Sequence, residues 1–134
     1  MEGMDKKICL DTDVLIFALK NIAYYELIER NFSDYTFYTT TITIFELYQR
    51  ETNLHKIDAL IANFTVLDFD AHAAATASGI FKHLRAKGIL VEIKDLFIAS
   101  VALSNDCELL TNNIKDFKNI PKLKLVGIDG ETKE

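Results

Sequence analysis

A short apolar run that stops at a carboxylate places the strongest constraint on the fold. Ile8-Cys9-Leu10 ends at Asp11, and an apolar pattern of helical spacing resumes at Val14. In an open α/β sheet, ligands bind in the crevice beyond the carboxyl ends of the strands. A carboxylate between such a strand and the following helix is therefore expected to face the crevice instead of the core.

Strand-like and helix-like segments alternate along the rest of the chain, which is typical of α/β proteins with a parallel sheet. The pattern predicts strands near 6–11, 36–39, 64–67, 107–111 and 123–127. Helices are predicted near 14–19, 22–31, 42–51, 54–63, 71–87 and 94–105, the longest with Asp70 as its N-cap and Gly88 as its C′ residue. No linker or repeat interrupts the pattern, so we expect one domain over 1–128 and a loose tail over 129–134.

Composition limits the classes of partner and compartment. The chain carries 15 Lys and Arg against 20 Asp and Glu, a formal net charge of −5, which disfavours binding nucleic acid mainly through phosphate neutralisation. It does not exclude a phosphate-handling enzyme, because bound divalent cations reverse the local sign of a carboxylate site. Cys9 and Cys107 lie in apolar runs without metal-binding spacing. With no signal-peptide pattern and no apolar run long enough to cross a bilayer, we expect a cytoplasmic protein with reduced thiols.

Two acids lie at the predicted ends of the first two strands, and each has an alternative interpretation. Asp11 is a good helix N-cap, but Thr12 and Asp13 compete for that position, so capping requires only one of the three. Glu46 lies three residues after Thr43, which is the spacing of a capping box in which Glu46 reaches back to the Thr43 backbone. Glu46 is also one turn into a helix that starts at the same sheet edge as Asp11.

Two further acids lie near helix starts later in the chain. Asp95 is flanked by apolar residues, and a partly desolvated carboxylate needs a partner, which can be a metal ion or Lys94. A strand-like run then ends at Thr111, Asn112 and Asn113, followed by Asp116. Thr111 or Asn112 can cap a short helix with Asp116 in its first turn.

Convergence of these acids at one sheet edge predicts a metal site. Clustered carboxylates repel one another unless a cation binds among them. Oxygen ligands of this kind suit Mg²⁺ or Mn²⁺ better than zinc. Such ions can activate water and clamp a phosphodiester for hydrolysis.

The ordered set of motifs resembles the PIN-domain family of metal-dependent ribonucleases, and most closely its VapC-type toxins. Four segments carry the resemblance: Leu10–Ile16, Thr43–Leu47, Ile93–Ala99 and Leu110–Phe117. The resemblance implies a three-layer α/β/α sandwich around a parallel sheet of strand order 3-2-1-4-5. It also implies endonucleolytic cleavage of RNA with Mg²⁺ or Mn²⁺.

The resemblance also implies roles for individual residues. By matching position, Asp11 and Asp95 are expected to be the principal metal ligands, and Glu46 the third acid. Many family members have a fourth acid where this chain has Asn113, so either Asp116 takes that role or a second metal binds weakly. Asp13 stands where the family often has a small polar residue, and it is a candidate to restore the missing charge. Thr12, Asp13, Thr111 and Asn113 are expected to be supporting or substrate-contacting polar residues.

The same resemblance implies partners and leaves alternatives open. VapC-type toxins are usually homodimers held inactive by a small antitoxin that inserts a basic side chain among the acids. An RNA-maturation nuclease and a non-catalytic RNA- or protein-binding module are the alternatives within the family. Ile8–Val14 also resembles the first motif of haloacid-dehalogenase-type phosphatases, with Asp11 as nucleophile and Asp13 as general acid. That alternative must take its late acids from Leu125–Glu131, near the end of the chain, and leaves Glu46 and Asp95 without roles.

Overall fold

A six-stranded sheet forms the centre of the protein, in the order β3-β2-β1-β4-β5-β6. The computed structural model describes residues 6–133, so the expectations for Met1–Asp5 and for Glu134 lie outside the described residues. Strands β1 to β5 are parallel neighbours in this order, whereas β6 pairs antiparallel with β5. The predicted order 3-2-1-4-5 is therefore confirmed, with one strand added at the edge. The strands are β1 Lys6–Leu10, β2 Tyr35–Thr40, β3 Thr65–Leu67, β4 Glu108–Leu110, β5 Leu125–Val126 and β6 Thr132–Lys133.

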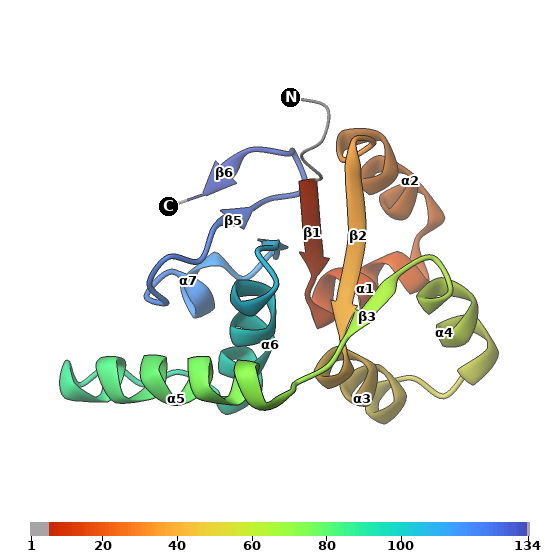
Figure 1. Ribbon diagram of the computed structural model, residues 1–134. Coiled ribbons are helices and arrows are strands. Elements are labelled where there is room, and N and C mark those ends of the chain that lie inside the picture. The colour runs from red at the N-terminus through yellow and green to blue at the C-terminus, as the bar shows by residue number, and fades with distance from the viewer. Residues whose placement is uncertain (1–5, 134) are drawn as a thin grey trace.

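Helices cover both faces of this sheet, which gives the three layers implied by the resemblance (Figure 1). All six predicted helices are present, within a few residues of their expected bounds. A seventh, short helix follows β4, at the place where the sequence suggested a short helix with Asp116 in its first turn. The helices are α1 Thr12–Lys20, α2 Ile22–Asn31, α3 Thr41–Arg50, α4 Leu54–Ile61, α5 Ala71–Ala86, α6 Ile93–Ser104 and α7 Ile114–Phe117.

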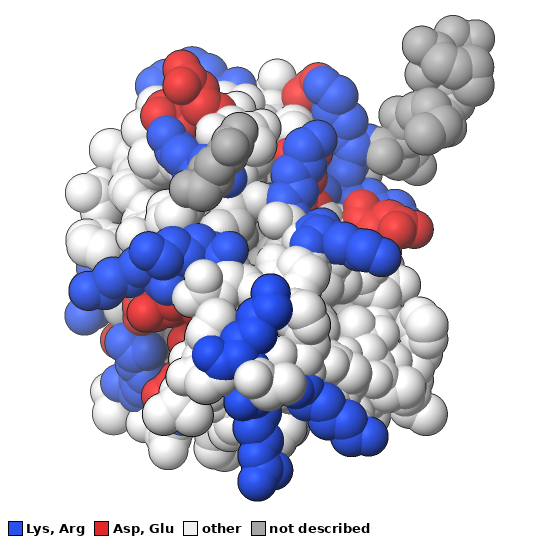
Figure 2. Space-filling model, turned by 90° about the vertical axis from the view of Figure 1, so that its left-hand side faces the viewer, with Lys and Arg blue, Asp and Glu red and all other residues white. Residues whose placement is uncertain are grey.

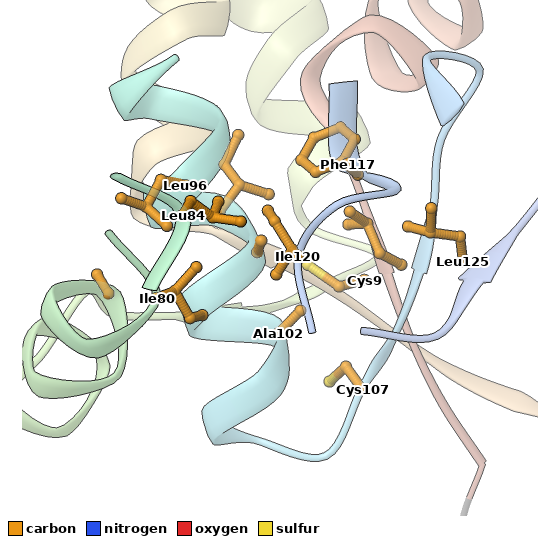
Figure 3. Close-up of a cluster of buried hydrophobic side chains, with 13 residues drawn as sticks. Cys9, Ile80, Leu84, Leu96, Ala102, Cys107, Phe117, Ile120 and Leu125 are labelled. Atoms are coloured by element: carbon orange, nitrogen blue, oxygen red, sulfur yellow. The ribbon is translucent and has the colours of Figure 1, made fainter. Parts of the chain in front are cut away.

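Alternating side chains along the strands build two separate cores. Ile8 and Leu10 of β1 pack in a cluster with residues of α1 to α4, whereas Cys9 between them packs with α5, α6 and the segment around α7. Leu109 and Leu110 of β4 divide between the two clusters in the same way. Figure 3 shows the second cluster, in which Cys9 and Leu125 of the sheet meet apolar side chains of α5 and α6. Burial on both faces fixes the register, because a slip of one residue would exchange the two sets.

Local signals identified some helix ends correctly and others wrongly. The Ala73 backbone N–H donates to Asp70 Oδ1 at 2.9 Å, so the predicted N-cap of α5 is confirmed. Gly88 has φ of +73° just after that helix, a conformation that favours glycine, and its predicted C′ role is also confirmed. The proposed cap of α3 at Thr43 is wrong. The N-cap is Thr40, whose hydroxyl accepts from the Thr43 backbone N–H at 3.0 Å.

Two further expectations concern the thiols and the membrane. Cys9 and Cys107 are both free and buried. Over residues 6–133, none of the helices has the length and apolar character that spanning a bilayer requires.

Candidate active site

An acidic cavity of about 130 Å³ lies where the carboxyl end of β1 meets the first turns of α1, α6 and α7 and the side of α3 that carries Glu46 and Arg50. All four acids proposed as catalytic line it, although they are separated by up to about a hundred residues in sequence. Parallel pairing of β1 with β2 and β4 aligns the strand ends from which most of these side chains start. The lining residues are Asp11, Thr12, Asp13, Glu46, Arg50, Glu92, Asp95, Ile98, Asn113 and Asp116.

Asp11 is both a helix cap and part of the cavity wall. Its Oδ1 accepts from the Val14 backbone N–H at 3.2 Å, and its Oδ2 accepts from the Thr111 hydroxyl at 2.5 Å. The Asp11 backbone N–H donates to the carbonyl of Leu110, which holds the end of β1 against β4. Burial raises the pKa of Asp11 to about 6, partly offset by the two hydrogen bonds. The capping and the site interpretations are therefore both satisfied by one side chain.

Glu46 is held by side chains from two other helices. The hydroxyl of Thr12 donates to Glu46 Oε1 at 2.5 Å, and Lys94 Nζ lies 3.5 Å from Glu46 Oε2. The carboxylate thus does not reach back to cap its own helix, and the capping-box interpretation is wrong. Because Glu46 is only 9% exposed, its charge is compensated by Lys94 and by the Thr12 hydrogen bond. Thr12 serves to orient Glu46 instead of capping α1.

Asp95 lies half-buried in the first turn of α6 and faces the same acids. Burial, followed by the charges of Glu92, Asp116, Asp11 and Glu46, raises the pKa of Asp95 to about 7. Lys94, the alternative partner considered for Asp95, pairs with Glu46 instead. Asp95 therefore retains strong repulsion from its neighbours, as expected for a carboxylate that shares a hollow with others.

Asp13 and Asn113 contact one another across the mouth of the site. Asn113 Nδ2 donates to Asp13 Oδ2 at 2.6 Å, and Arg50 Nη1 lies 3.2 Å from Asp13 Oδ1. Asp13 is thus engaged by an amide and by a cation. Arg50, in the last turn of α3, is a site residue that the sequence did not reveal, because nothing local distinguishes it from an ordinary helix C-terminal cation.

The segment after β4 places three more polar residues around the cavity. Thr111 accepts from the Asn113 backbone N–H at 2.9 Å while donating to Asp11. The N-cap of α7 is Asn113, so the expectation that Thr111 or Asn112 caps this helix is wrong. Asp116 lies in the first turn of α7, as expected, and lines the cavity.

Side chains missed from the sequence complete the site. Glu92, the N-cap residue of α6, lines the cavity, and Lys94 provides a cation beside Glu46. Across residues 6–133, no three Asp, Glu, His or Cys side chains converge closely enough to hold a metal ion in their present rotamers. Asp11, Glu46 and Asp13 are instead bound to hydrogen-bond donors and cations of the chain. The donor set itself consists of oxygen atoms, which suits Mg²⁺ or Mn²⁺.

The phosphatase alternative finds no support in this arrangement. Asp129, the candidate late acid, is exposed and pairs with Lys133 at 2.9 Å. It does not line the cavity, whereas Glu46 and Asp95 do.

Comparison with known proteins agrees with this geometry. The PIN domain family model matches residues 8–123. Ribonuclease VapC2 of Rickettsia felis is 31% identical over 129 residues, covering 90% of this chain and 96% of the relative. The tRNA(fMet)-specific endonuclease VapC of Salmonella typhimurium is 31% identical over 126 residues, covering 89% and 96%.

Solved structures give the same assignment. A chain of DNA-bound VapBC from Salmonella typhimurium superposes with a TM-score of 0.81 at 31% identity, covering 93% of this chain and 99% of that one. VapBC2 from Rickettsia felis, bound to a promoter DNA fragment, also gives 0.81, at 28% identity, covering 90% and 98%. The matched segment contains every acid that lines the cavity. This chain therefore belongs to the PIN-domain family, among its VapC ribonucleases.

Proposed function

We propose that this protein is an Mg²⁺- or Mn²⁺-dependent endoribonuclease that cleaves RNA phosphodiesters and acts as the toxin of a toxin–antitoxin pair. The observation that carries the proposal is the convergence of Asp11, Glu46, Asp95 and Asp116 on one cavity at the sheet edge. Relatives named as VapC ribonucleases, matched over nearly their whole length, support the reaction class.

Asp11, Asp95 and Glu46 are the residues proposed to hold the ion. A divalent cation there would activate water for attack and neutralise charge on the phosphodiester. The fit is one of donor chemistry: oxygen ligands only, and two carboxylates whose raised pKa values reflect burial and mutual repulsion that a cation would relieve. Thr111 and the Val14 backbone N–H fix the Asp11 carboxylate, and Thr12 fixes that of Glu46. Asp116 is the further acid proposed in place of the carboxylate that Asn113 lacks.

Cleavage of a panel of single-stranded RNAs in Mn²⁺, repeated in EDTA, tests the proposal. Wild type is expected to cut only with the metal, and Asp11→Asn is expected to lose most of the activity, about a hundredfold or more. The exposed Asp68, outside the cavity, provides the matched control Asp68→Asn, which should cut normally. No metal-dependent cutting by wild type would favour the non-catalytic binding module. Equal cutting by wild type and Asp11→Asn would indicate a contaminating nuclease.

Metal binding has a readout that is independent of activity. An ion that binds only the native state raises the free energy of unfolding, by about 2.7 kcal/mol at a hundredfold excess over its Kd. Mn²⁺ is therefore expected to raise the melting temperature of wild type and of Asp68→Asn, but much less that of Asp11→Asn. An equal rise in all three would place the ion elsewhere.

The proposed partners are a second copy of the chain and a small antitoxin. The VapBC complexes among the similar structures support the antitoxin. The cavity already accommodates the guanidinium of Arg50 beside Asp13, so a basic side chain of an inhibitor suits it. For the homodimer, exposed apolar side chains on α1 to α3 supply contact area: Phe17, Ile22, Phe45 and Tyr48. Light scattering on the purified protein tests this state.

A further inference from the structure

A second cavity, of about 260 Å³, adjoins the acidic cavity. The two share Glu92, Asp95 and Asp116, so a ligand in one continues directly into the other. The second cavity lies between the end of α5, the loop that leads into α6, and α7. The proposed hydrolysis of the phosphodiester uses the shared acids Asp95 and Asp116 but none of the residues that line the second cavity alone.

The walls of this cavity are mostly polar, with an apolar part. Besides the three acids that it shares with the acidic cavity, Lys115 and Asn119 line it, and both are exposed. Because Asn119 is exposed and lines the cavity, its side-chain amide can offer two donors and an acceptor to a ligand. The apolar surface comes from Leu84, Ile89, Val91 and Ile120.

Leu90 marks the rim of the cavity. Its side chain is 94% exposed, although its neighbours Ile89 and Val91 pack partly against the core. A leucine held almost fully in water beside a cavity is available to contact a ligand that enters there.

Unpaired cations lie on the elements that frame this cavity, and one of them, Lys115, lines it. Six exposed Lys and Arg side chains on the last two turns of α5, on α7 and in the segments that follow them form no ion pair with a described residue. Figure 2 shows basic side chains spread over this side of the molecule, with acidic ones beside them. In a chain of net charge −5, such a concentration favours a polyanion over an apolar peptide as the occupant. The six are Lys82, Arg85, Lys87, Lys115, Lys118 and Lys122.

From this arrangement we infer that the second cavity is a subsite for one unpaired nucleobase of the RNA, next to the phosphodiester that is cut. The inference rests on the proposed ribonuclease function. The apolar wall contacts the flat face of the base, Asn119 hydrogen-bonds its edge, and the ammonium of Lys115 meets the adjoining phosphate. RNA-binding proteins commonly recognise single strands by this combination of apolar contact and edge hydrogen bonds. The subsite would therefore set sequence preference at one position beside the cut.

Filling the cavity from its rim tests the inference. Asn119→Trp places an indole where the base is expected, and Ser78→Trp, at an exposed neutral position on α5 outside both cavities, is the matched control. Both are assayed on an RNA that wild type cuts and on versions made abasic at single positions flanking the cut. Removing the interaction with one base is expected to lower wild-type kcat/KM about tenfold at one position.

We expect the Asn119→Trp substitution and the removal of the base to abolish the same contact, so that their effects on kcat/KM do not add. On the intact RNA, kcat/KM of Asn119→Trp should be about tenfold below that of wild type. On the RNA that lacks the contacted base, kcat/KM of the two proteins should be equal, because the base contact is already missing there. Ser78→Trp should follow wild type on every substrate. Wild-type behaviour of Asn119→Trp on intact RNA would overturn the subsite and leave the cavity to a protein partner. The subsite would also be overturned if Asn119→Trp lowered kcat/KM by the same factor on the abasic RNA as on the intact RNA.

Binding separates failure of this inference from failure of the nuclease proposal. Anisotropy of labelled RNA is measured with Asn119→Trp and Ser78→Trp, each combined with Asp11→Asn to prevent turnover. Weaker binding by the Asn119→Trp protein alone supports the subsite, even where wild type cuts none of the RNAs. Equal binding by the two proteins contradicts it.

Discussion

The Asp11 carboxylate is only 4% exposed, and both of its oxygens accept hydrogen bonds. Its pKa nevertheless rises to about 6, because burial disfavours the charged form more than the two donors favour it. Asp95 faces the same acids with a pKa of about 7. At neutral pH the metal-free site therefore holds repelling charge that the fold must tolerate.

Burial, together with this repulsion, predicts that the metal-free protein loses stability as pH rises from about 4 to about 7. In that range the native state holds protons on Asp11 and Asp95 that the unfolded state has released, so stability falls with rising pH. For Asp11 alone, the change from 3.8 to about 6 corresponds to about 3 kcal/mol. Urea unfolding in EDTA at several pH values measures the fall.

The matched variant for this measurement is Asp11→Asn, since asparagine is also a good N-cap but does not titrate. Its stability should change less over the same pH range than that of wild type. Identical pH profiles for the two proteins would show that Asp11 titrates normally.

A second prediction at the residue scale concerns Asn113, which donates to Asp13 Oδ2 at 2.6 Å. Asn113→Asp replaces this hydrogen bond with two facing carboxylates, and the loss is expected to be about 1–3 kcal/mol in EDTA. Mn²⁺ should recover more stability in this variant than in wild type, because a fourth acid adds a ligand. The exposed Asn112, bound to the Tyr24 hydroxyl, provides the control Asn112→Asp, in which that hydroxyl can donate to the new carboxylate. Equal stabilities for the two variants would contradict the prediction.

At the scale of elements, the first turns of α1 and α6 are both joined to Glu46 in the middle of α3. Thr12 of α1 donates to Glu46 of α3, and Lys94 of α6 pairs with the same carboxylate. The hydroxyls of Thr12 and Thr43 are also within hydrogen-bond distance, at 3.4 Å. These contacts hold α1, α3 and α6 together where their side chains line the acidic cavity.

Removing the Thr12 hydroxyl is expected to loosen this junction. Thr12→Val keeps the shape of the side chain but leaves the buried Glu46 Oε1 without its donor, which should reduce the free energy of unfolding by about 1–3 kcal/mol. Cleavage should fall as well, because Glu46 is no longer oriented. Thr65→Val, on the exposed side of β3, should change stability by less than about 0.5 kcal/mol. Urea unfolding measures the free energy of unfolding of both variants. Similar decreases in the two variants would contradict a special role for the Thr12 hydroxyl.

The elements also show where sequence information suffices. Alternation of apolar runs predicted β1 to β5 and six helices, because burial on both faces of a parallel sheet leaves a strong pattern. It could not predict β6, whose two residues carry no periodicity and pair only because the chain turns back at Gly130. Nor could it choose between Thr40 and Thr43 as the cap of α3, since both residues are cap-competent.

Some features of the site could likewise be predicted from the sequence, and others could not. Asp11, Glu46, Asp95 and Asp116 were predicted to gather, because parallel strands bring their carboxyl ends to one edge. The pairings of Glu46 with Thr12 and Lys94, and of Asp13 with Arg50, join residues more than thirty positions apart. Such contacts depend on how helices pack, which no local spacing encodes.

At the scale of the whole molecule, charge is distributed unevenly. The acids of the site line a cavity at the sheet edge, while Lys and Arg side chains without an ion pair to a described residue lie on the end of α5, on α7 and after these helices. Figure 2 shows basic side chains spread over this side of the molecule, with acidic ones beside them. The cations would attract a polyanion to this side of the molecule. At the acidic cavity, a bound divalent ion would offset the repulsion between the acids and the phosphates. The net negative charge is thus compatible with an RNA substrate, because the unpaired cations can meet phosphates while a bound divalent ion would offset the charge of the acids.

The unpaired cations on and after α5 and α7 predict that the salt dependence of RNA affinity arises mainly from this side of the molecule. Lys82→Ala combined with Lys118→Ala removes two exposed cations from that face, whereas Arg30→Ala with Lys56→Ala removes two from α2 and α4. Removal of one cation that binds a phosphate should flatten the slope of log affinity against log salt by about 0.7 for a single strand. Anisotropy titrations of labelled RNA at several salt concentrations should therefore give a flatter slope for the first pair, and a wild-type slope for the second. Equal slopes would mean that RNA reaches the acidic cavity across some other surface, because net charge is changed identically in the two proteins.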